Sequence, residues 1–390
     1  MTTVSDVTFD GELRPAVGDS ARLNALLPSP CVQNHAANLH VLPSGELLCV
    51  WFGGTQEGIP DISIYLSRLP AGGERWSEPV KLSDDDTRSE QNPILFYAGD
   101  GELWLLYTAQ LSGHQNTSIV RRRISLDEGK SWGPVETLFD RPGTFVRHPP
   151  VILDNGDWIC PVFYCRTQPG ERWVGNDDIS AVLVSSDRGR RWEEYEVPDS
   201  VGCVHMNVIK LEAGELVAVY RSRWADNIYL SRSHDGRHWS APEKTTLPNN
   251  NSSIQSIRLA DGTLAMVYNH INADGVTERR TSLYDDIEDS ESHGELRDQD
   301  AIHGKSAFWG VPRAPMSLAF SRDGGKTWTQ RRDLEVGDGY CMTNDSATRA
   351  NREYSYPSIV QGADNVLHIA FTRFRQCIQY SRVTLDWIDG

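Results

Sequence analysis

The sequence has 390 residues and a formal net charge of -16, and 39% of its residues are hydrophobic. This charge argues against a nucleic acid or an anionic membrane surface as a partner, because binding phosphate groups requires a basic patch that outweighs it. An anionic ligand would have to be bound locally, by a few arginines.

The first thirty residues contain no basic stretch followed by an apolar run, so we expect neither a signal peptide nor a membrane-spanning helix, and a cytoplasmic location. The seven cysteines are scattered and form no CxxC pair, which predicts neither a disulfide framework nor a zinc site. We therefore expect no metal and no cofactor. The 12 Trp, 32 Gly and 20 Pro favour an all-β chain with many turns.

A short motif recurs along the chain. It reads S-x-D-x-G-x-x-W in three full copies, and two further copies are shortened or degenerate. In chain order the copies are SRLPAGGERW (67–76), SLDEGKSW (125–132), SSDRGRRW (185–192), SHDGRHW (233–239) and SRDGGKTW (321–328). The motif predicts a tight hairpin turn in which the Ser and Asp side chains accept backbone N–H bonds, Gly takes a positive φ and Trp packs beneath.

Six apolar runs lie between these motifs, and each follows a turn signal. We expect them to form inner strands of β-sheets: GELLCVWFGG (45–54), GELWLLYTAQ (101–110), GDWICPVFYC (156–165), GELVAVYRSR (214–223), GTLAMVYNHI (262–271) and NVLHIAFTRF (365–374). The motif tryptophans are separated by about the length of one four-stranded sheet with its connections, so six runs predict six blades of a β-propeller. We expect the N- and C-terminal segments to share one blade, because this closes the ring and hides the last sheet edges.

The regular spacing of turn motifs and apolar runs is interrupted at 271–312, which includes an acidic stretch at 284–300. We therefore predict an all-β fold, a single six-bladed β-propeller domain over 1–390 with four-stranded antiparallel blades and an insertion at about 271–312. The simplest interpretation of the insertion is a solvated surface loop. A lid over the site and a contact surface in a homo-oligomer are the alternatives.

The motifs resemble a known family when taken with three flanking segments, NHAANLHVLPSGELLCVWFGG (34–54), LPNNNSSIQSIRLADGTLAMVYN (247–269) and REYSYPSIVQ (352–361). Together they resemble the BNR or Asp-box repeat proteins of the sialidase superfamily, and the resemblance spans nearly the whole chain. It implies a sialidase-like propeller with its site at one mouth of the central channel. In true sialidases three arginines bind the substrate carboxylate, a Tyr assisted by a Glu is the nucleophile, and an Asp is the acid/base.

The resemblance assigns roles to individual residues. Arg221 and Arg313 match the second and third carboxylate arginines, and Tyr356 matches the nucleophile. Two positions depart from the family pattern, because His35 stands where the first arginine is expected and His205 where the Glu is expected. These departures put orthodox sialidase chemistry in doubt.

The acid/base region offers Gln56 and Glu57, with Asp61 further into the strand. The predicted catalytic residues are therefore His35, His205, Tyr356 and Glu57. The predicted substrate-binding residues are Arg221, Arg313, Arg147, Gln91, Asn92 and Asp61, because guanidinium forks suit carboxylates and amides at a channel mouth suit sugar hydroxyls. Weaker candidates are His148, His270, Arg223, Arg373 and the amides at 249–251.

Three functions remain open on this sequence, and the first two act on an acidic oligosaccharide. One is β-elimination next to a uronic acid, with Arg221 and Arg313 neutralising the carboxylate, His205 or His35 as base and Tyr356 as proton donor. The second is hydrolysis with Tyr356 as nucleophile. The third is a catalytically silent propeller that binds a glycan or a protein.

Overall fold

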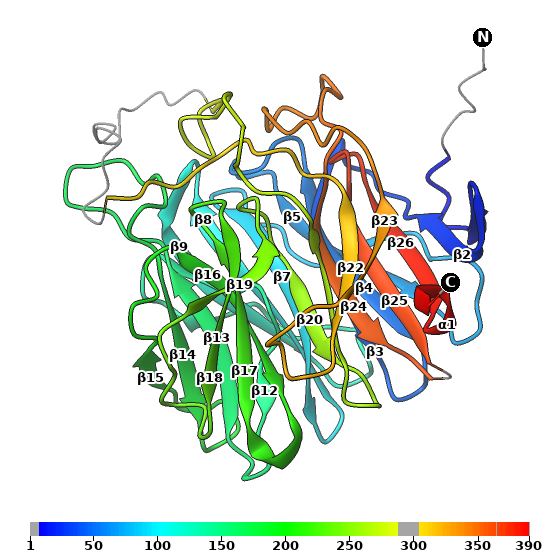
Figure 1. Cartoon of the computed structure of the whole chain (residues 1–390), viewed down its shortest axis with the longest axis horizontal. Coiled ribbons are helices and arrows are strands. Elements are labelled where there is room, and N and C mark those ends of the chain that lie inside the picture. The colour runs from blue at the N-terminus through cyan, green and yellow to red at the C-terminus, as the bar shows by residue number, and fades with distance from the viewer. Residues whose placement is uncertain (1–7, 288–303, 364, 390) are drawn as a thin grey trace.

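Six antiparallel β-sheets surround a common axis in the computed structural model, which describes residues 8–287, 304–363 and 365–389 (Figure 1). Neighbouring sheets meet along their innermost strands; the innermost strand of the first sheet, for example, lies between those of the second and the sixth. The predicted six-bladed β-propeller is confirmed. No helix in the described part of the chain is long and apolar enough to cross a membrane.

In each sheet the strands follow one another from the axis outward. The first contains β3 (Gln33–Val41), β4 (Leu47–Gly54), β5 (Ser63–Leu69) and β6 (Val80–Lys81). The second contains β7 (Ser89–Gly99), β8 (Glu102–Leu111), β9 (His114–Ser125) and β10 (Glu136–Phe139). The third contains β11 (Thr144–Phe145) and β12 (Val151–Ile152), which both pair with β13 (Trp158–Tyr164), followed by β14 (Ile179–Ser185) and β15 (Glu193–Glu196).

The remaining sheets follow the same plan. The fourth contains β16 (Cys203–Lys210), β17 (Leu216–Ser222), β18 (Asn227–Ser233) and β19 (Glu243–Pro248). The fifth contains β20 (Gln255–Arg258), β21 (Leu264–Asn269), β22 (Met316–Ser321) and β23 (Gln330–Glu335). The sixth contains β24 (Tyr354–Gln361), β25 (Val366–Arg373), β26 (Cys377–Thr384), β2 (Asp19–Leu26) and β1 (Arg14–Ala16). The helical pieces are the 3-10 turn η1 (Glu212–Gly214) and the short helix α1 (Asp386–Asp389).

The sixth sheet joins the two ends of the chain. Strand β2 pairs antiparallel with β26, with Leu23 opposite Arg382 and Leu26 opposite Gln379, and the two strands lie side by side in Figure 1. The expectation that the N- and C-terminal segments share a blade is confirmed. The ring is therefore closed by backbone hydrogen bonds between strands from opposite ends of the sequence.

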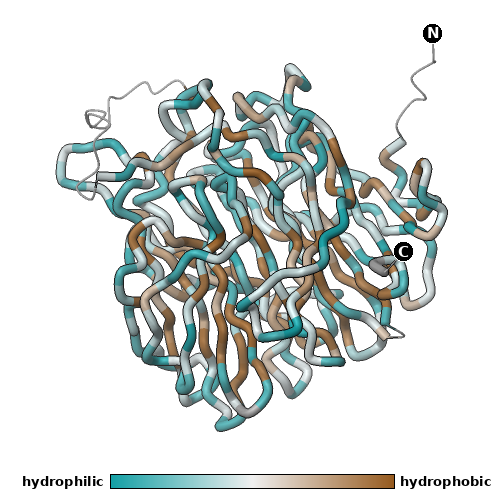
Figure 2. The backbone as a smooth tube through the Cα atoms, viewed as in Figure 1, coloured by the Kyte–Doolittle hydropathy of each residue, from teal (hydrophilic) through white to brown (hydrophobic). Residues whose placement is uncertain are grey.

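The six apolar runs form inner strands as predicted, and each is the second strand of its sheet. They correspond to β4, β8, β13, β17, β21 and β25. A second strand is hydrogen-bonded on both sides and packs both faces against neighbouring blades, so it is mostly apolar (Figure 2). The sequence pattern did not identify the innermost strands, because they carry polar side chains that join blades. Asn38 Oδ1 accepts from the backbone N–H of Leu95, and Gln255 Oε1 accepts from that of Ile359.

The core consists of apolar clusters between adjacent blades. Between the second and third blades, Phe96, Trp104 and Trp158 pack edge to face, with ring centroids 5.0 to 6.1 Å apart. Such edge-to-face pairs are favourable beyond the area they bury. The blades are therefore held in place by packing around the whole ring.

The repeated motifs form the predicted turns between the third and fourth strands. In the copy at 125–132, Ser125 Oγ accepts from the backbone N–H of Gly129 at 2.7 Å, and Asp127 Oδ1 accepts from that of Ser131 at 2.8 Å. Gly129 has φ +78°. The copies at 185–192 and 321–328 repeat these bonds, so the motif is structural.

The innermost strands bend where they begin. Four of them contain a β-bulge, and a non-glycine residue at or next to each bulge has a positive φ of 50° to 61°. These residues are Ala36, Asn92, His205 and Tyr356. In the third sheet the innermost strand is interrupted at 146–150 instead. Bulges re-aim side chains, and these bends place several predicted site residues around the axis.

A long connection between β21 and β22 crosses the same end of the propeller (Figure 1). It contains the predicted insertion, of which 288–303 lies outside the described residues. The interpretation as a solvated loop is wrong for the described part, because Leu283, Tyr284 and Trp309 are buried. The Tyr284 hydroxyl lies within hydrogen-bonding distance of three glutamine amides from the second blade, those of Gln91, Gln110 and Gln115. This connection therefore packs over the mouth of the channel.

Candidate active site

The bent ends of the innermost strands, together with the connections beside them, bring several predicted residues into one buried cluster. His35 lies on β3, His205 on β16, Arg221 on β17 and Tyr356 on β24, while Arg313 precedes β22. All five are at least 93% buried, since the most exposed of them, Arg313, is 7% exposed. Residues from four blades, the first, fourth, fifth and sixth, therefore meet near the axis.

Arg221 connects most of this cluster. Its Nε donates to Asn251 Oδ1 at 2.8 Å, and its Nη1 donates to the hydroxyl of Tyr356 at 2.6 Å and contacts His205 Nε2 at 3.3 Å. Its Nη2 is buried and has no hydrogen-bond partner among the described residues. Burial, with Arg223 and Arg313 nearby, lowers the pKa of Arg221 to about 9, although the charge of Tyr356 acts in the opposite direction. An unpaired guanidinium nitrogen in a dry site is where an anion would be stabilised.

Tyr356 lies at the centre of the cluster. The guanidinium carbons of Arg147, Arg221 and Arg313 lie 5.4, 5.6 and 5.6 Å from the centre of its ring. Its φ of +51° is unusual for an aromatic residue and is maintained by the bulge in β24. Because Arg221 donates to the hydroxyl, the oxygen of Tyr356 acts as an acceptor in this contact.

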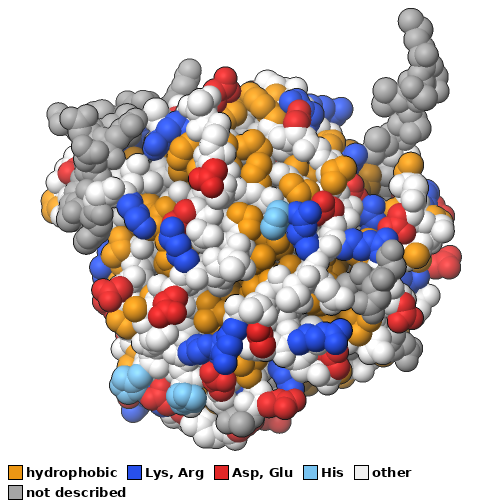
Figure 3. Space-filling model, viewed as in Figure 1, with side chains coloured by type: hydrophobic (Ala, Val, Ile, Leu, Met, Phe, Trp, Pro, Cys, Tyr) orange, Lys and Arg blue, Asp and Glu red, His pale blue; other side chains and the backbone are white. Residues whose placement is uncertain are grey.

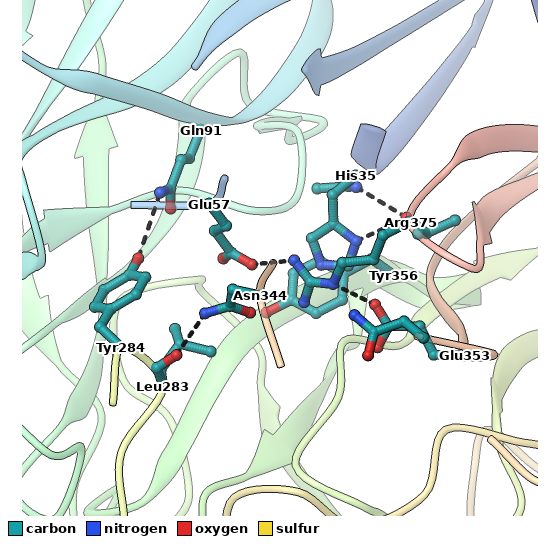
Figure 4. A network of polar contacts seen from close by, with 12 residues as sticks. His35, Glu57, Gln91, Leu283, Tyr284, Asn344, Glu353, Tyr356 and Arg375 are labelled. Atoms are coloured by element: carbon teal, nitrogen blue, oxygen red, sulfur yellow. Dashed lines mark hydrogen bonds and ion pairs between the residues drawn. The ribbon is translucent and has the colours of Figure 1, made fainter. Parts of the chain in front are cut away.

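The two histidines flank this ring. The His35 ring centroid lies 4.2 Å from that of Tyr356, and its Nδ1 is 2.8 Å from Thr372 Oγ1 (Figure 4). The His205 ring centroid lies 5.6 Å from that of Tyr356. Burial lowers the pKa of both rings well below the usual value, and neighbouring arginines lower it further. Both histidines are therefore neutral near pH 7.

Arg147 is held by the scaffold. Its Nη2 donates to the carbonyls of Ala37, Tyr356 and Pro357 at 3.1 to 3.2 Å, and its Nε donates to Ser253 Oγ at 3.0 Å. Burial lowers its pKa to about 10. These bonds join the third blade to the first, fifth and sixth, and Nη1 has no partner among the described residues. Arg147 therefore fixes the backbone at Tyr356 and Pro357.

Two residues that the sequence did not single out, Arg375 and Glu353, complete the cluster (Figure 4). Arg375 donates from Nε to Glu353 Oε1 and from Nη1 to Glu57 Oε2. Glu353 also accepts from Arg313 Nη1 at 2.9 Å. Burial opposes ionisation of Glu353, but Arg375 and Arg313 more than compensate and lower its pKa. The position of Arg375, in the turn after β25, carried no signal in the sequence.

The remaining predicted residues take different positions. Glu57 is buried beside Arg375. Asp61 is exposed, and its Oδ2 accepts from the backbone N–H of Thr55 at 3.0 Å, so it stabilises a turn. Gln91 donates to Ser89 Oγ at 3.0 Å and to Tyr284, and Asn92 is buried at the bulge of β7.

The weaker candidates also take different positions, some beside the cluster and others away from it. His148 is buried next to Arg147, and burial lowers its pKa well below the usual value. Arg223 is bound by Asp178, with Nε and Nη2 at 2.9 and 2.7 Å. Arg373 packs against the ring of Phe374 and lines a groove with Glu12, Glu335 and Gln379, away from the cluster. His270 pairs with Tyr268 on the fifth blade.

The cluster carries an excess of positive charge in an acidic protein. Four arginines interact electrostatically with Tyr356, and two carboxylates, Glu57 and Glu353, accompany them. The arginines are Arg147, Arg221, Arg313 and Arg375. On the face shown in Figure 3, acidic and basic side chains are instead interspersed. Two uncompensated guanidinium charges in a buried site favour an anionic ligand.

Metal coordination finds no support in the described residues, where no group of three or more His, Cys, Asp or Glu side chains is arranged to hold a metal ion. The polar groups available to a ligand are guanidinium nitrogens, the phenol of Tyr356 and the unpartnered nitrogens His35 Nε2 and His205 Nδ1. These groups bind anions and move protons.

Known structures with the same architecture include several sialidases. A Hadza microbial sialidase has a TM-score of 0.67 and 13% identity, over 92% of this chain and 67% of its own. The intramolecular trans-sialidase of Ruminococcus gnavus, in complex with oseltamivir carboxylate, has a TM-score of 0.66 and 11% identity, over 98% and 99%. A protein of unknown function from Dyadobacter fermentans has a TM-score of 0.65 and 17% identity, over 92% and 97%.

At these identities the similarity establishes the fold alone. No curated protein matches the sequence. The family model described as BNR repeat-like domain matches residues 45–369, which is most of the chain. The chain therefore belongs to the BNR repeat-like domain family and has a sialidase-like propeller fold.

Proposed function

We propose that this protein cleaves a glycosidic bond at a carboxylate-bearing sugar of an acidic oligosaccharide. Arg221 and Arg313 would bind the carboxylate, and the oxygen of Tyr356 would act on the sugar. The sialidase-like fold supports a glycan-cleaving role in general terms, and the composition of the buried cluster supports the acidic substrate.

One observation carries the proposal. The guanidinium of Arg221 donates to the Tyr356 hydroxyl through Nη1, while its Nη2 lacks a partner in the described part of the chain. A carboxylate oxygen on Nη2 would satisfy that nitrogen and place the sugar beside the phenol oxygen, since the two nitrogens of one guanidinium are about 2.3 Å apart by bond geometry. The same arginine would then hold both the substrate and the reacting group.

The arrangement favours β-elimination. In this reaction a base removes the proton next to the carboxylate, the electron pair forms a C=C bond, the C–O bond to the leaving group breaks, and the leaving oxygen takes up a proton. Arginines that neutralise the carboxylate make the neighbouring C–H more acidic. Both carboxylates of the cluster are paired with Arg375, so neither is free to serve as a general acid without rearrangement.

Tyr356 is better suited than the histidines to be the base. His35 and His205 have lowered pKa values and lie among arginines, so a proton on either ring is disfavoured. The oxygen of Tyr356 is already an acceptor from Arg221. In this step Tyr356 would react as the phenolate, take up the substrate proton to become the phenol, and then donate that proton to the leaving oxygen. His205 would orient Arg221 through Nε2.

Hydrolysis is the second candidate, and the position of Glu57 favours it. Glu57 is buried and bound by Arg375 within the cluster that contains Tyr356 (Figure 4). If substrate binding released Glu57 from Arg375 and Glu57 took up a proton, its carboxyl could protonate the leaving oxygen as the anomeric C–O bond breaks and the phenolate oxygen of Tyr356 attacks the anomeric carbon. Water would then displace Tyr356 from that carbon and complete the hydrolysis. Several structural matches are described as sialidases.

The experiment that separates these reactions is an incubation with a panel of uronic-acid and sialic-acid oligosaccharides. Ultraviolet absorbance of an unsaturated uronate and the number of new reducing ends are followed together. Tyr356→Phe removes the phenol oxygen, and Tyr195→Phe, on the exposed strand β15, is the matched control.

Each outcome has a distinct meaning. An unsaturated product that is lost in Tyr356→Phe and retained in Tyr195→Phe supports elimination. Reducing ends without absorbance support hydrolysis. If no substrate is cleaved but acidic oligosaccharides still raise the melting temperature, the protein is a binding module and the catalytic proposal is wrong.

A further inference from the structure

A single amide lies between Arg221 and the connection that covers the mouth. Asn251 Oδ1 accepts from Arg221 Nε at 2.8 Å, and Asn251 Nδ2 donates to the carbonyl of Phe308 at 2.9 Å. Phe308 belongs to the connection between β21 and β22. Asn251 is 2% exposed, so the bond to Arg221 is shielded from water, while the bond to Phe308 is partly buried.

The chemistry of the two partners fixes how this amide is oriented. The Nε of Arg221 can only donate, and the carbonyl of Phe308 can only accept. Asparagine supplies one acceptor and one donor on adjacent atoms, which an aspartate, a serine or an alanine at position 251 could not do in the same geometry. The side-chain type is therefore matched to this pair of contacts.

The backbone of Asn251 is tied to the strand that carries Arg221. Asn249 Oδ1 accepts from the N–H of Asn251 at 3.1 Å and from the N–H of Ser222 at 3.0 Å. Ser222 follows Arg221 directly in β17. Asn251 has φ +56°, a conformation that asparagine tolerates better than most residues. Asn251 is therefore held rigidly beside Arg221.

The covering segment, defined here as residues 304–309, docks onto the third and fourth blades. The N–H of Phe308 donates to the carbonyl of Arg223 at 2.8 Å, and Trp309 Nε1 donates to the carbonyl of Val174 at 3.0 Å. The guanidinium carbon of Arg221 lies 5.6 Å from the ring centre of Trp309. The segment thus lies directly over the guanidinium whose Nη2 is unpartnered.

We infer that Asn251 is a positioning residue that couples the covering segment to Arg221, so that Arg221 is aligned on Tyr356 when the segment is docked. The coupling runs from the Phe308 carbonyl through the Asn251 amide to Arg221 Nε, and from Arg221 Nη1 to the Tyr356 hydroxyl. Its effect on catalysis rests on the proposed function, whereas the coupling between segment and arginine does not.

The coupling is tested first without substrate, by hydrogen–deuterium exchange of the peptide covering 304–312 in the full chain. Asn251→Ala removes both contacts. Asn250→Ala is the matched control, because Asn250 Nδ2 donates to the carbonyl of Pro312 at 2.8 Å but does not contact Arg221. Arg221→Lys perturbs the other end of the coupling, and the double variant Asn251→Ala/Arg221→Lys tests whether the two effects share one route.

We expect Asn251→Ala and Arg221→Lys each to increase the exchange rate of this peptide about tenfold, and the double variant to show no further increase, because coupling is reciprocal. Additive effects, or an unchanged exchange rate in Arg221→Lys, would overturn the inference. These readouts remain informative if the protein cleaves nothing.

Where a substrate is found, the second test is kinetic. Asn251→Ala is expected to lower kcat about tenfold with little change in KM, because misalignment of a reacting group slows the reaction more than it weakens binding. In the Arg221→Lys background the same substitution should have no further effect. An equal loss of kcat in Asn250→Ala, with a matching loss of thermal stability, would show a general structural role and contradict the positioning role.

Discussion

Arg221 Nη1 lies 2.6 Å from the hydroxyl of Tyr356, although the two residues are 135 positions apart in the chain and belong to the fourth and sixth blades. The contact exists because β17 ends, and β24 begins, at the same mouth of the propeller. It links the charge that would bind a substrate to the group that would act on it, and its consequences are measurable.

Replacement of Arg221 by lysine should abolish most of the activity. A lysine ammonium cannot donate to Asn251, Tyr356 and a substrate carboxylate in the fork geometry of a guanidinium. We expect kcat/KM on an acidic oligosaccharide to fall at least about 100-fold. Arg373→Lys is the control, because Arg373 lines a groove away from the cluster, and an equal loss there would contradict a specific role for Arg221.

Stability should decrease as the pH falls below about 6.5, the usual pKa of histidine in an unfolded chain. Burial lowers the pKa of His35, His148 and His205 in the folded state, so below this pH the unfolded chain binds more protons than the folded one. Each such histidine contributes a slope of up to about 1.4 kcal/mol per pH unit to the free energy of unfolding.

Urea unfolding between pH 5 and pH 7.5 measures this slope. His148→Gln should reduce the slope of the free energy of unfolding against pH by about 1.4 kcal/mol per pH unit. The slopes of the variant and the original protein should differ in the acidic part of this range. His238→Gln, at a side chain that is 82% exposed, is the control. An unchanged slope in His148→Gln would show that His148 is not buried in the neutral form.

Glu353→Gln should destabilise the fold strongly. Glu353 is fully buried and accepts from both Arg313 and Arg375, so the substitution leaves buried positive charge without its counter-ion. We expect a decrease of about 3 to 5 kcal/mol in the free energy of unfolding. Glu196→Gln removes an exposed partner of Arg166 and should change it by about 1 kcal/mol or less. Equal decreases in the free energy of unfolding for the two variants would argue against a cluster that is shielded from water.

Gly189→Ala tests the turn motif. Gly189 has φ +80°, and a Cβ atom there would lie 2.6 Å from the ring of Trp104. Backbone strain and overpacking together should lower the free energy of unfolding by about 2 to 4 kcal/mol. Gly156→Ala has φ +86° but open space around the added methyl group, so the difference between the two variants isolates the packing contribution.

The sequence predicted the fold because its signals are local. The turn motif at 125–132 contains within eight residues every group that forms the turn, and the apolar runs mark the strands that are buried on both faces. Those runs form inner strands of the sheets as predicted, whereas the innermost strands such as β3 and β24 mix polar and apolar side chains. The hydrophobic pattern of the sequence does not distinguish polar side chains that form hydrogen bonds between blades from polar side chains on the surface.

The candidate residues that the structure brings together are those for which the resemblance supplied the register. His35, His205, Arg221, Arg313 and Tyr356 lie together as expected. The resemblance gave no place for Arg375 and Glu353, whose pairing depends on how the turn after β25 folds back over β24. Asp61 shows the converse, because a carboxylate close to the site in sequence serves a turn.

The pairing of β2 with β26 has a consequence for biosynthesis. Strand β2 is synthesised long before its partner β26, so the ring closes only after residues 377–384 have left the ribosome. Tyr356 lies just upstream of that point, on β24. A chain translated only as far as β23 therefore contains Arg147, Arg221 and Arg313 but lacks the phenol, Arg375 and a closed ring, and the cluster is completed only when the last two strands of the sixth blade have been made.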